Sequence, residues 1–248
     1  MKLTSRFYPV ALLLMLCGPI TAFVNVLGGQ TQSISNKNTR LQAKKEATFG
    51  MGCFWKPSEE MLKVDGVLET TAGYTGNPTA KEAPTYDKVC FSRDWVEGVR
   101  LSYDDEKISY LELLDRFFAA QEPKPGSRQY ASIIFPHDDK QREAAQAWLQ
   151  EGTRSQRVRE DGVPVSFTRI EHLSDFYAAE GYHQRYWQKF RPRVAAVIGC
   201  IILQLAPLDG AVAPDVLSVL HAVTGFSLKA MGAYVLLERV IDTKVVRL

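Results

Sequence analysis

The stretch EATFGMGCFWKPSEEMLKV, residues 46–64, contains a short strand, a glycine turn and the beginning of a helix. Residues 46–49 favour a strand, and the glycines on either side of Met51 allow a tight, unhindered backbone directly after it. Pro57 stands where the first helical position is expected, with acidic residues behind it. Cys53 is therefore expected at the junction between the end of a strand and the start of a helix.

Outward from this stretch, strand-like and helix-like segments alternate along the chain. The β-rich segments are 67–74, 96–103, 131–135 and 163–170, and the helical segments are 57–64, 108–120, 138–151 and 175–191. In 108–120 the expected core stripe consists of Leu111, Leu114, Phe117 and Phe118. Short connections between alternating elements predict α/β or α+β layers around a single sheet.

The C-terminal part of the chain is more apolar than the rest. Residues 194–206 read VAAVIGCIILQLA, and two further apolar segments follow near 214–222 and 226–241. They predict extra helices that pack on the domain or contact a partner. Since no continuous apolar run reaches the roughly 20 residues of a membrane helix, contact with a membrane is not expected.

The composition excludes several classes of protein. The chain has 248 residues, and its 30 Lys and Arg nearly balance 28 Asp and Glu, which gives no basis for nucleic-acid binding. Its four cysteines form no CxxC pair, so a disulfide scaffold and a cysteine-rich zinc module are both excluded. Residues 1–45 hold six basic side chains and no acidic one, whereas the body is mildly acidic.

The basic N-terminal segment reads as a targeting leader. Residues 1–22 resemble a secretory signal, with Lys2 and Arg6 before an eight-residue apolar run. Residues 23–45 have the composition of a transit peptide. The Ala-Phe junction at 22–23 resembles the bipartite plastid leader of algae with secondary plastids, which predicts a plastid location. Simple secretion, to the secretory pathway or the cell exterior, is the alternative.

Cys53 is the most suggestive residue of the body. A helix start carries a partial positive charge that lowers the pKa of a thiol, and Lys56 adds a nearby cation. Phe54 and Trp55 could form an apolar wall beside the sulfur. The residues alone are equally compatible with a nucleophilic thiolate and with an inert, buried cysteine.

Six short motifs resolve this ambiguity, because in this order they resemble the methionine sulfoxide reductase A family. The resemblance covers about residues 46–190. The motifs are GCFW at 52–55, AGYTG at 72–76, PTYDKVC at 84–90, EGVR at 97–100 with YD at 103–104, QYAS at 129–132 and AEGYHQ at 179–184.

The resemblance implies the chemistry of a peptide-methionine (S)-S-oxide reductase, an enzyme of protein repair under oxidative stress. The thiolate of Cys53 would attack the electrophilic sulfur of methionine sulfoxide, leaving a sulfenic acid. Glu97 would donate a proton to the sulfoxide oxygen, which requires a raised pKa. Tyr86 and Tyr130 would hold that oxygen. Phe54, Trp55 and Tyr74 would bind the substrate, with the first two receiving its methyl group.

The resemblance also implies the surroundings of this chemistry. The family fold is an α/β two-layer sandwich with a mixed sheet, and it uses no metal or organic cofactor. The expected partners are proteins or peptides that contain methionine sulfoxide, together with thioredoxin, glutaredoxin or a small thiol as reductant. A monomer is expected. The predicted domains are the signal at 1–22, the leader at 23–45, the catalytic domain at 46–192 and a helical extension at 193–248.

The sequence departs from the family pattern in several places. The segment between Cys90 and Glu97 is one residue shorter than in the family, and Ala131 replaces an Arg. The loop before Tyr130 is short and lacks the carboxylate that the family has there, and the only nearby acid in sequence is Glu122. The usual glycine-rich segment with resolving cysteines is missing after residue 184. Cys200 is the candidate resolving cysteine, but it lies in an apolar run. A one-cysteine cycle, reduced directly by an external thiol, is therefore preferred.

Two other functions remain open at this point. A degenerate relative could bind methionine-sulfoxide proteins without turnover, which the lost carboxylate would favour. A Cys–His acyl-transfer enzyme would use Cys53 and His183, although no Asn or Asp partner for the histidine is evident. Without the family, His183 is better explained as a hydrogen-bonding residue on a helix face.

Overall fold

The computed structural model describes residues 44–207, 212–241 and 245–248. The expected signal at 1–22 and nearly all of the transit-like leader lie outside the described residues, so the targeting of the protein stays a prediction. The first strand begins at Lys44, two residues before the expected start of the catalytic domain.

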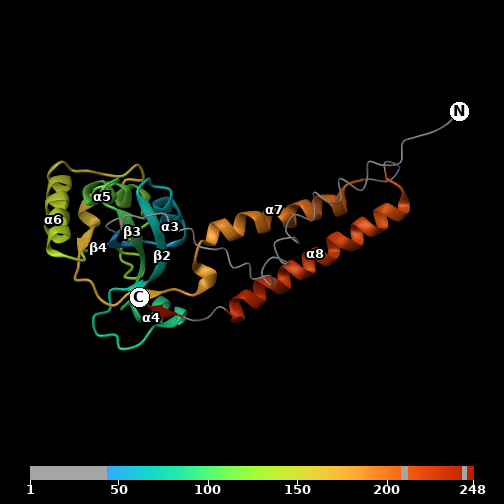
Figure 1. Cartoon of the computed structure of the whole chain (residues 1–248), viewed down its shortest axis with the longest axis horizontal. Helices are drawn as coiled ribbons and strands as arrows, with labels where there is room; N and C mark the ends of the chain where they lie inside the picture. Colours follow the sequence, from blue (N-terminus) through green and yellow to red (C-terminus); the bar gives the residue numbers. More distant parts are fainter. Residues whose placement is uncertain (1–43, 208–211, 242–244) are drawn as a thin grey trace, which may run out of the picture. The chain divides into compact units, whose positions relative to one another are not determined.

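The body alternates strands and helices as expected (Figure 1). The strands are β1 (Lys44–Met51), β2 (Val67–Thr75), β3 (Val96–Asp104), β4 (Ser132–Phe135), β5 (Arg169–Ile170), β6 (Tyr177–Ala178) and β7 (Val246–Arg247). The helices are α3 (Trp55–Leu62), α4 (Tyr86–Ser92), α5 (Tyr110–Ala120), α6 (Asp139–Arg154), α7 (Tyr186–Leu205) and α8 (Pro214–Ile241), with 3-10 turns at Val165–Phe167 and Gly181–His183.

The strands form one mixed sheet in the order β5-β4-β1-β3-β2-β6-β7. The pairs β1–β3, β1–β4 and β2–β3 are antiparallel, and β4–β5 is parallel. The predicted α/β architecture with a mixed sheet is confirmed. The two longest pairings, β1–β3 and β2–β3, bring the end of β1, the start of β3 and the end of β2 to the same end of the sheet. There Gly50, Gly98 and Gly73 are in register.

Helix α3 packs on β2, helix α5 packs on β1 and on α3, and α6 packs on α5. The core between these layers is aromatic: Phe49 of β1 stacks on Phe117 of α5 with ring centroids 4.8 Å apart. Leu113 and Leu114 of α5 are fully buried, whereas Leu111 is half exposed, so the expected core stripe of this helix was wrong by one position. The Ser109 capping box fixes the start of the helix and therefore which of its side chains face the core. Leu113 is one of these buried side chains.

The opposite face of the sheet is covered by a loop that ends in Phe176. Gly73 and Gly98 are paired on β2 and β3, and a Cβ on Gly73 would collide with the Phe176 ring. The absence of side chains at these positions lets the aromatic ring lie directly on the sheet.

Two predicted elements differ in the structure. Residues 163–170 form a 3-10 turn and a two-residue strand instead of one long strand. The segment expected as a helix at 175–191 contains β6 and a second 3-10 turn, and α7 begins only at Tyr186. A left-handed Arg185, with φ of 50°, separates that turn from α7.

The extension is helical, as predicted, but α8 is one helix where two segments were expected. Helix α7 runs through Pro192 without interruption and packs against α8. Helix α8 is long and apolar enough to cross a membrane by length and composition, and very little of it is buried. The expectation drawn from continuous apolar runs missed this helix, because it treated residues 214–222 and 226–241 as two separate apolar segments.

Candidate active site

Cys53 lies between the end of β1 and the first turn of α3, as expected. Gly52 has a φ of 78°, and a Cβ there would collide with the carbonyl oxygen of Glu122. The backbone amide of Glu122 donates to the carbonyl of Met51 over 2.7 Å, so β1 is tied to the loop that leads toward Tyr130. Glycine at position 52 is therefore required both by its left-handed conformation and by close backbone approach.

The thiol of Cys53 is half-buried and free. Burial raises its pKa above the ordinary value, a backbone hydrogen bond from Trp55 opposes this, and the carboxylates of Glu97 and Glu122 raise it further. The expected lowering of this pKa by the helix start is therefore wrong, since desolvation outweighs it. Lys56, the expected cation, is instead paired with Glu122 over 2.6 Å.

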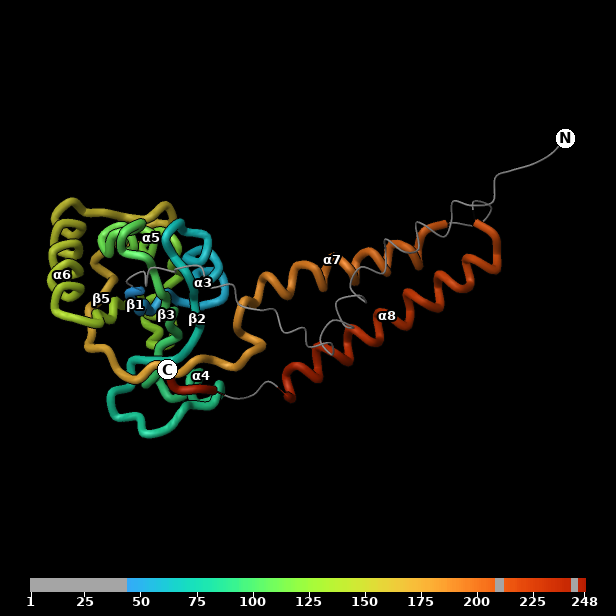
Figure 2. Tube along the Cα trace, in the orientation of Figure 1, coloured from blue at the N-terminus to red at the C-terminus, as the bar shows by residue number. Residues whose placement is uncertain are grey.

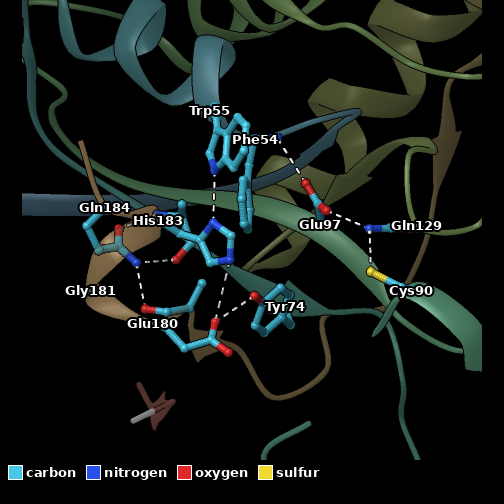
Figure 3. A network of polar contacts seen from close by, with 12 residues as sticks. Phe54, Trp55, Tyr74, Cys90, Glu97, Gln129, Glu180, Gly181, His183 and Gln184 are labelled. Atoms are coloured by element: carbon cyan, nitrogen blue, oxygen red, sulfur yellow. Dashed lines mark hydrogen bonds and ion pairs between the residues drawn. The ribbon is translucent and has the colours of Figure 1, made fainter. Parts of the chain in front are cut away.

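Glu97 is the second residue of β3 and is almost completely buried beside Cys53. Its Oε2 accepts a hydrogen bond from the backbone amide of Phe54 over 3.2 Å, and its Oε1 accepts one from Gln129 Nε2 over 2.7 Å (Figure 3). Burial raises the pKa of Glu97 to about 7, against the opposing effect of these two donors and Lys124. A carboxyl group in this range can hold and release a proton near neutrality.

Tyr86 and Tyr130 flank this carboxyl group from two other segments. Tyr86 is the first residue of α4, and Tyr130 precedes β4. Burial raises the pKa of both phenols, that of Tyr130 to about 12, and the charge of Glu97 raises both further. Both hydroxyls therefore remain protonated donors at neutral pH and lie close to Glu97. Cys53, Glu97, Tyr86 and Tyr130 are brought together at one end of the sheet.

A second polar network holds the aromatic residues of the GCFW motif. The indole Nε1 of Trp55 donates to Nδ1 of His183 over 2.9 Å, and Tyr74 donates through its hydroxyl to Glu180 Oε2 over 2.8 Å (Figure 3). Tyr74 is fully buried and Phe54 is 1% exposed, with its ring packed against Tyr74 and His183. Of the three expected substrate-binding residues, only Trp55 is partly exposed.

His183 is a structural residue of this network. Because Nδ1 accepts a hydrogen bond from Trp55, the proton of the neutral ring is on Nε2, which faces Glu180 at 3.9 Å. Burial lowers the pKa of His183 to about 4, so the ring is neutral. Both nitrogens face these two residues, and the arrangement gives no support to a Cys–His acyl-transfer site. The interpretation as a hydrogen-bonding residue is confirmed, on a 3-10 turn instead of an α-helix.

The comparison with known families shows to which family the chain belongs. The family model described as peptide methionine sulfoxide reductase matches residues 45–200. The chain belongs to the peptide methionine sulfoxide reductase family. Relatives named peptide methionine sulfoxide reductase MsrA include one from Methanosarcina mazei, 35% identical over 173 residues (64% of this chain, 79% of the relative). Another, from Methanothermobacter thermautotrophicus, is 39% identical over 157 residues (60% of this chain, 89% of the relative).

Among solved structures, the chain is similar to reduced Mxr1 from Saccharomyces cerevisiae, with 25% identity and a TM-score of 0.46 over 65% of this chain and 93% of that one. Membership of the family and the named relatives establish thiol-dependent reduction of methionine sulfoxide as the activity. They give no support to the alternative of a binding protein without turnover.

Within this reductase, the other described cysteines are placed differently. Gln129 Nε2 donates weakly to Sγ of Cys90 over 3.7 Å, which puts this thiol next to the amide that holds Glu97 (Figure 3). Cys200 lies in α7, fourteen residues after Tyr186, whose ring stacks on Trp55 at 3.9 Å. A helix rise of 1.5 Å per residue puts Cys200 about 20 Å along α7 from that stack. The structure does not bring Cys200 near Cys53.

Two residues of the reductase site were missed at the sequence level. Gln129 belongs to the QYAS motif, but nothing in the motif shows that its amide binds Glu97. Lys124 lies with its ammonium 4.6 Å from the ring centroid of Tyr130, and its charge opposes the raised pKa values of Cys53 and Glu97. A cation therefore lies in the shortened loop that lacks the family carboxylate.

Proposed function

We propose that the protein reduces the S-epimer of peptide-bound methionine sulfoxide, with Cys53 as nucleophile and Glu97 as proton donor. The observation that carries this assignment is the buried carboxyl of Glu97, bound to the amide that follows Cys53 and given a pKa of about 7. Such a group can supply a proton to the sulfoxide oxygen while the neighbouring sulfur attacks.

The reaction starts from a thiol and a carboxyl that interact electrostatically. The proton of the Cys53 thiol passes by way of Glu97 to the sulfoxide oxygen, while a bond forms between Sγ and the substrate sulfur. The hydroxyls of Tyr86 and Tyr130 donate hydrogen bonds to that oxygen and stabilise the developing charge. The hydroxyl oxygen then transfers from the substrate sulfur to Sγ: an Sγ–O bond forms, the substrate S–O bond and the transient bond between the two sulfurs break, and the thioether leaves. Sγ is thereby oxidised to the sulfenic acid, and the sulfoxide is reduced.

Regeneration of the thiol needs two external reducing equivalents. Two thiol groups convert the sulfenic acid into Cys53 and one water molecule, and they leave as a disulfide. The partly exposed Cys53 and the distance of Cys200 along α7 support direct reduction by a dithiol of the thioredoxin or glutaredoxin type, or by a small thiol. This is a one-cysteine cycle.

The aromatic residues contribute to the site in different ways. The partly exposed indole of Trp55 is the part of the GCFW motif that a substrate methyl group can contact. The buried Tyr74, through Glu180, and His183, through Trp55, are positioning residues that keep the first turn of α3 in place. We assign Phe54 to the packed wall behind the thiol.

The deciding experiment compares Glu97→Gln with the wild-type protein in two assays. Reduction of an N-acetylated methionine-(S)-sulfoxide amide is expected to fall by about 10²–10⁴-fold, the usual contribution of a proton donor. Alkylation of Cys53 by iodoacetamide should become faster, because the Glu97 charge that raises the thiol pKa is removed. Glu59→Gln, a buried glutamate of α3 that pairs with Arg191, is the matched control.

Several outcomes would overturn the assignment. Turnover by Glu97→Gln at the wild-type rate would exclude Glu97 as proton donor, and turnover by Cys53→Ser would exclude Cys53 as nucleophile. Reduction of the R-epimer at an equal rate would refute the stereochemical part of the proposal. A slower alkylation of Cys53 in the Glu97→Gln variant would show that the two groups are not coupled as described.

A further inference from the structure

The extension beyond the family match has an unusual surface. The match ends at residue 200, whereas α7 continues to Leu205 and α8 covers Pro214–Ile241. These two helices, here called the hairpin, run side by side in opposite directions (Figure 2). No residue of α7 is buried, and Thr224 is the one buried residue among those described in α8.

The exposed surface of the hairpin is apolar on nearly all sides. Its large exposed side chains include Ile202 at 60%, Leu205 at 78%, Phe226 at 73% and Leu236 at 69% exposure. A helix that contacts water on one side normally carries polar residues there, whereas one that is apolar all round is covered by protein or by lipid. Single apolar side chains scattered over a surface are normal, whereas a continuous exposed apolar surface of this kind indicates an interaction site.

The hydrogen bonds between the two helices of the hairpin are of the kind found in helix pairs that are surrounded by lipid. Gln204 Nε2 of α7 donates to Oγ1 of Thr224 over 3.2 Å, and the Thr224 hydroxyl also donates to the carbonyl of Leu220. A Cβ on Gly225 would lie 3.3 Å from Gln204, so a glycine lets the helices approach closely. Small residues and side-chain hydrogen bonds between helices are typical of helix pairs in lipid.

The charges of the hairpin are concentrated at its base, where it joins the catalytic domain. Arg185, Lys189, Arg191 and Arg193 surround the start of α7, and Arg239 lies near the end of α8. Glu238 is the acid among them, bound by Arg193 over 2.7 Å. Trp187 lies at the same base, and aromatic residues beside cations are typical of the region of lipid headgroups. The excess of cations complements an anionic membrane surface.

The length of α8 fits a bilayer. Its 28 residues extend about 40 Å at 1.5 Å per residue, compared with a hydrocarbon core of about 30 Å. Between Val216 and Leu237 the one residue with a permanent charge is Lys229. It lies eight residues, or about 12 Å, from Leu237. An exposed lysine at this depth can extend its ammonium group toward the headgroups.

From these observations we propose that the hairpin inserts into an anionic lipid bilayer and holds the catalytic domain at the membrane surface. The exposed apolar side chains provide the binding free energy, and the basic residues at the base set the orientation. Methionine sulfoxide in membrane-associated proteins would then be the substrate within reach. This inference concerns the extension and does not depend on the roles given to Cys53 and Glu97.

The test uses the full chain and vesicles of phosphatidylcholine with or without phosphatidylserine. In flotation assays the wild-type protein is expected to bind vesicles, more strongly with phosphatidylserine, and Ile202→Glu/Phe226→Glu is expected to lose most of that binding. Leu111→Glu, which adds a charge at an exposed leucine of α5, is the matched control and should float like the wild-type. All variants should reduce the small sulfoxide substrate equally in solution, which separates this proposal from the catalytic one.

A depth measurement distinguishes the hairpin from the apolar leader as the attachment. Phe226→Trp should show fluorescence that is quenched by lipids with brominated acyl chains, beyond the quenching of the four tryptophans of the wild-type chain. Flotation of Ile202→Glu/Phe226→Glu at the wild-type level, or no additional quenching in Phe226→Trp on bound vesicles, would overturn the proposal. If the wild-type protein does not bind vesicles but forms dimers, and the double variant does not form them, the proposal is overturned. The apolar surface of the hairpin would then bind a second copy of the chain.

Discussion

Gln129 and Glu97 bind each other twice: the side-chain amide of Gln129 donates to Glu97 Oε1 over 2.7 Å, and the backbone amide of Glu97 donates to the Gln129 carbonyl over 2.9 Å. The first bond stabilises the ionised carboxylate, and it therefore limits the rise of the Glu97 pKa that burial causes. The amide of one residue thus adjusts the proton affinity of the group that we propose as proton donor.

Gln129→Leu tests this relationship through the pH profile of kcat/KM. In the proposed mechanism the active state has one proton shared between Cys53 and Glu97, so the rate should rise with pH through the Glu97 pKa of about 7 and fall above that of the thiol. Loss of the amide raises the Glu97 pKa, and the acid limb should move to higher pH, with kcat/KM near pH 7 reduced by about three- to tenfold. Gln141→Leu removes a buried amide bound to the Glu46 carbonyl and should not move the limb. An unshifted limb in Gln129→Leu would contradict the coupling.

The tyrosines of the site should separate into two kinds. Tyr130→Phe removes a donor to the sulfoxide oxygen, and we expect kcat/KM to fall by about 10–100-fold with little change in stability. Tyr74→Phe leaves the buried carboxylate of Glu180 without its partner, so the free energy of unfolding should fall by about 1–3 kcal/mol while kcat/KM changes little. Urea unfolding and steady-state kinetics measure both. A Tyr74→Phe variant with normal stability and poor turnover would show that Tyr74 contacts the substrate.

Gly52→Ala should destabilise the protein by more than about 2 kcal/mol, because the new Cβ would meet the Glu122 carbonyl in a left-handed backbone. Gly162→Ala is a matched control. That glycine has a φ of 83° with no atom within 4 Å of a Cβ, so its substitution carries only the conformational cost of about 1 kcal/mol. Denaturant unfolding compares the two variants, and an equal loss in both would show that the close approach at Gly52 is unimportant.

Cys200→Ser should leave turnover unchanged, whether the reductant is dithiothreitol or thioredoxin. A disulfide needs Cα atoms within about 7 Å, and α7 carries Cys200 far along its axis from the Trp55 stack. Steady-state assays with each reductant, with Cys53→Ser as the inactive reference, measure this. Loss of activity with thioredoxin alone would show that Cys200 is a resolving cysteine and that α7 moves during the cycle.

Much of the fold could be predicted because its signals are local. The strand, glycine turn and helix around Cys53 appear as predicted, and the alternating strands and helices form the mixed sheet. The segment 175–191 was wrongly predicted as a helix because its polar side chains form separate hydrogen bonds to distant parts of the chain. Gln184, for example, binds both the backbone amide and the backbone carbonyl of Ala72. Long-range contacts of this kind leave no periodic pattern in the sequence.

The residues of the candidate site could be proposed from the sequence, but their electrostatics could not. Cys53, Glu97, Tyr86 and Tyr130 could be named from motifs, and the structure brings them together. The direction of the Cys53 pKa could not, since it depends on how deeply the thiol is buried and on which carboxylates face it. The pairing of Lys56 with Glu122, and of Lys124 with the ring of Tyr130, also depends on the fold of the shortened loop.

The short strand β7 gives the extension a mechanical property. Tyr177 of β6 pairs with Arg247, and Leu248 donates to the carbonyl of Phe176 over 2.9 Å, so the chain rejoins the sheet after α8. At its other end α7 is fixed by the stack of Tyr186 on Trp55. The extension is therefore attached to the body at both of its ends and is not a free tail. A force applied to the extension would be divided between the β6–β7 backbone hydrogen bonds and the aromatic stack beside Cys53. Removal of residues 201–248 would remove β7 and leave β6 as an exposed edge strand.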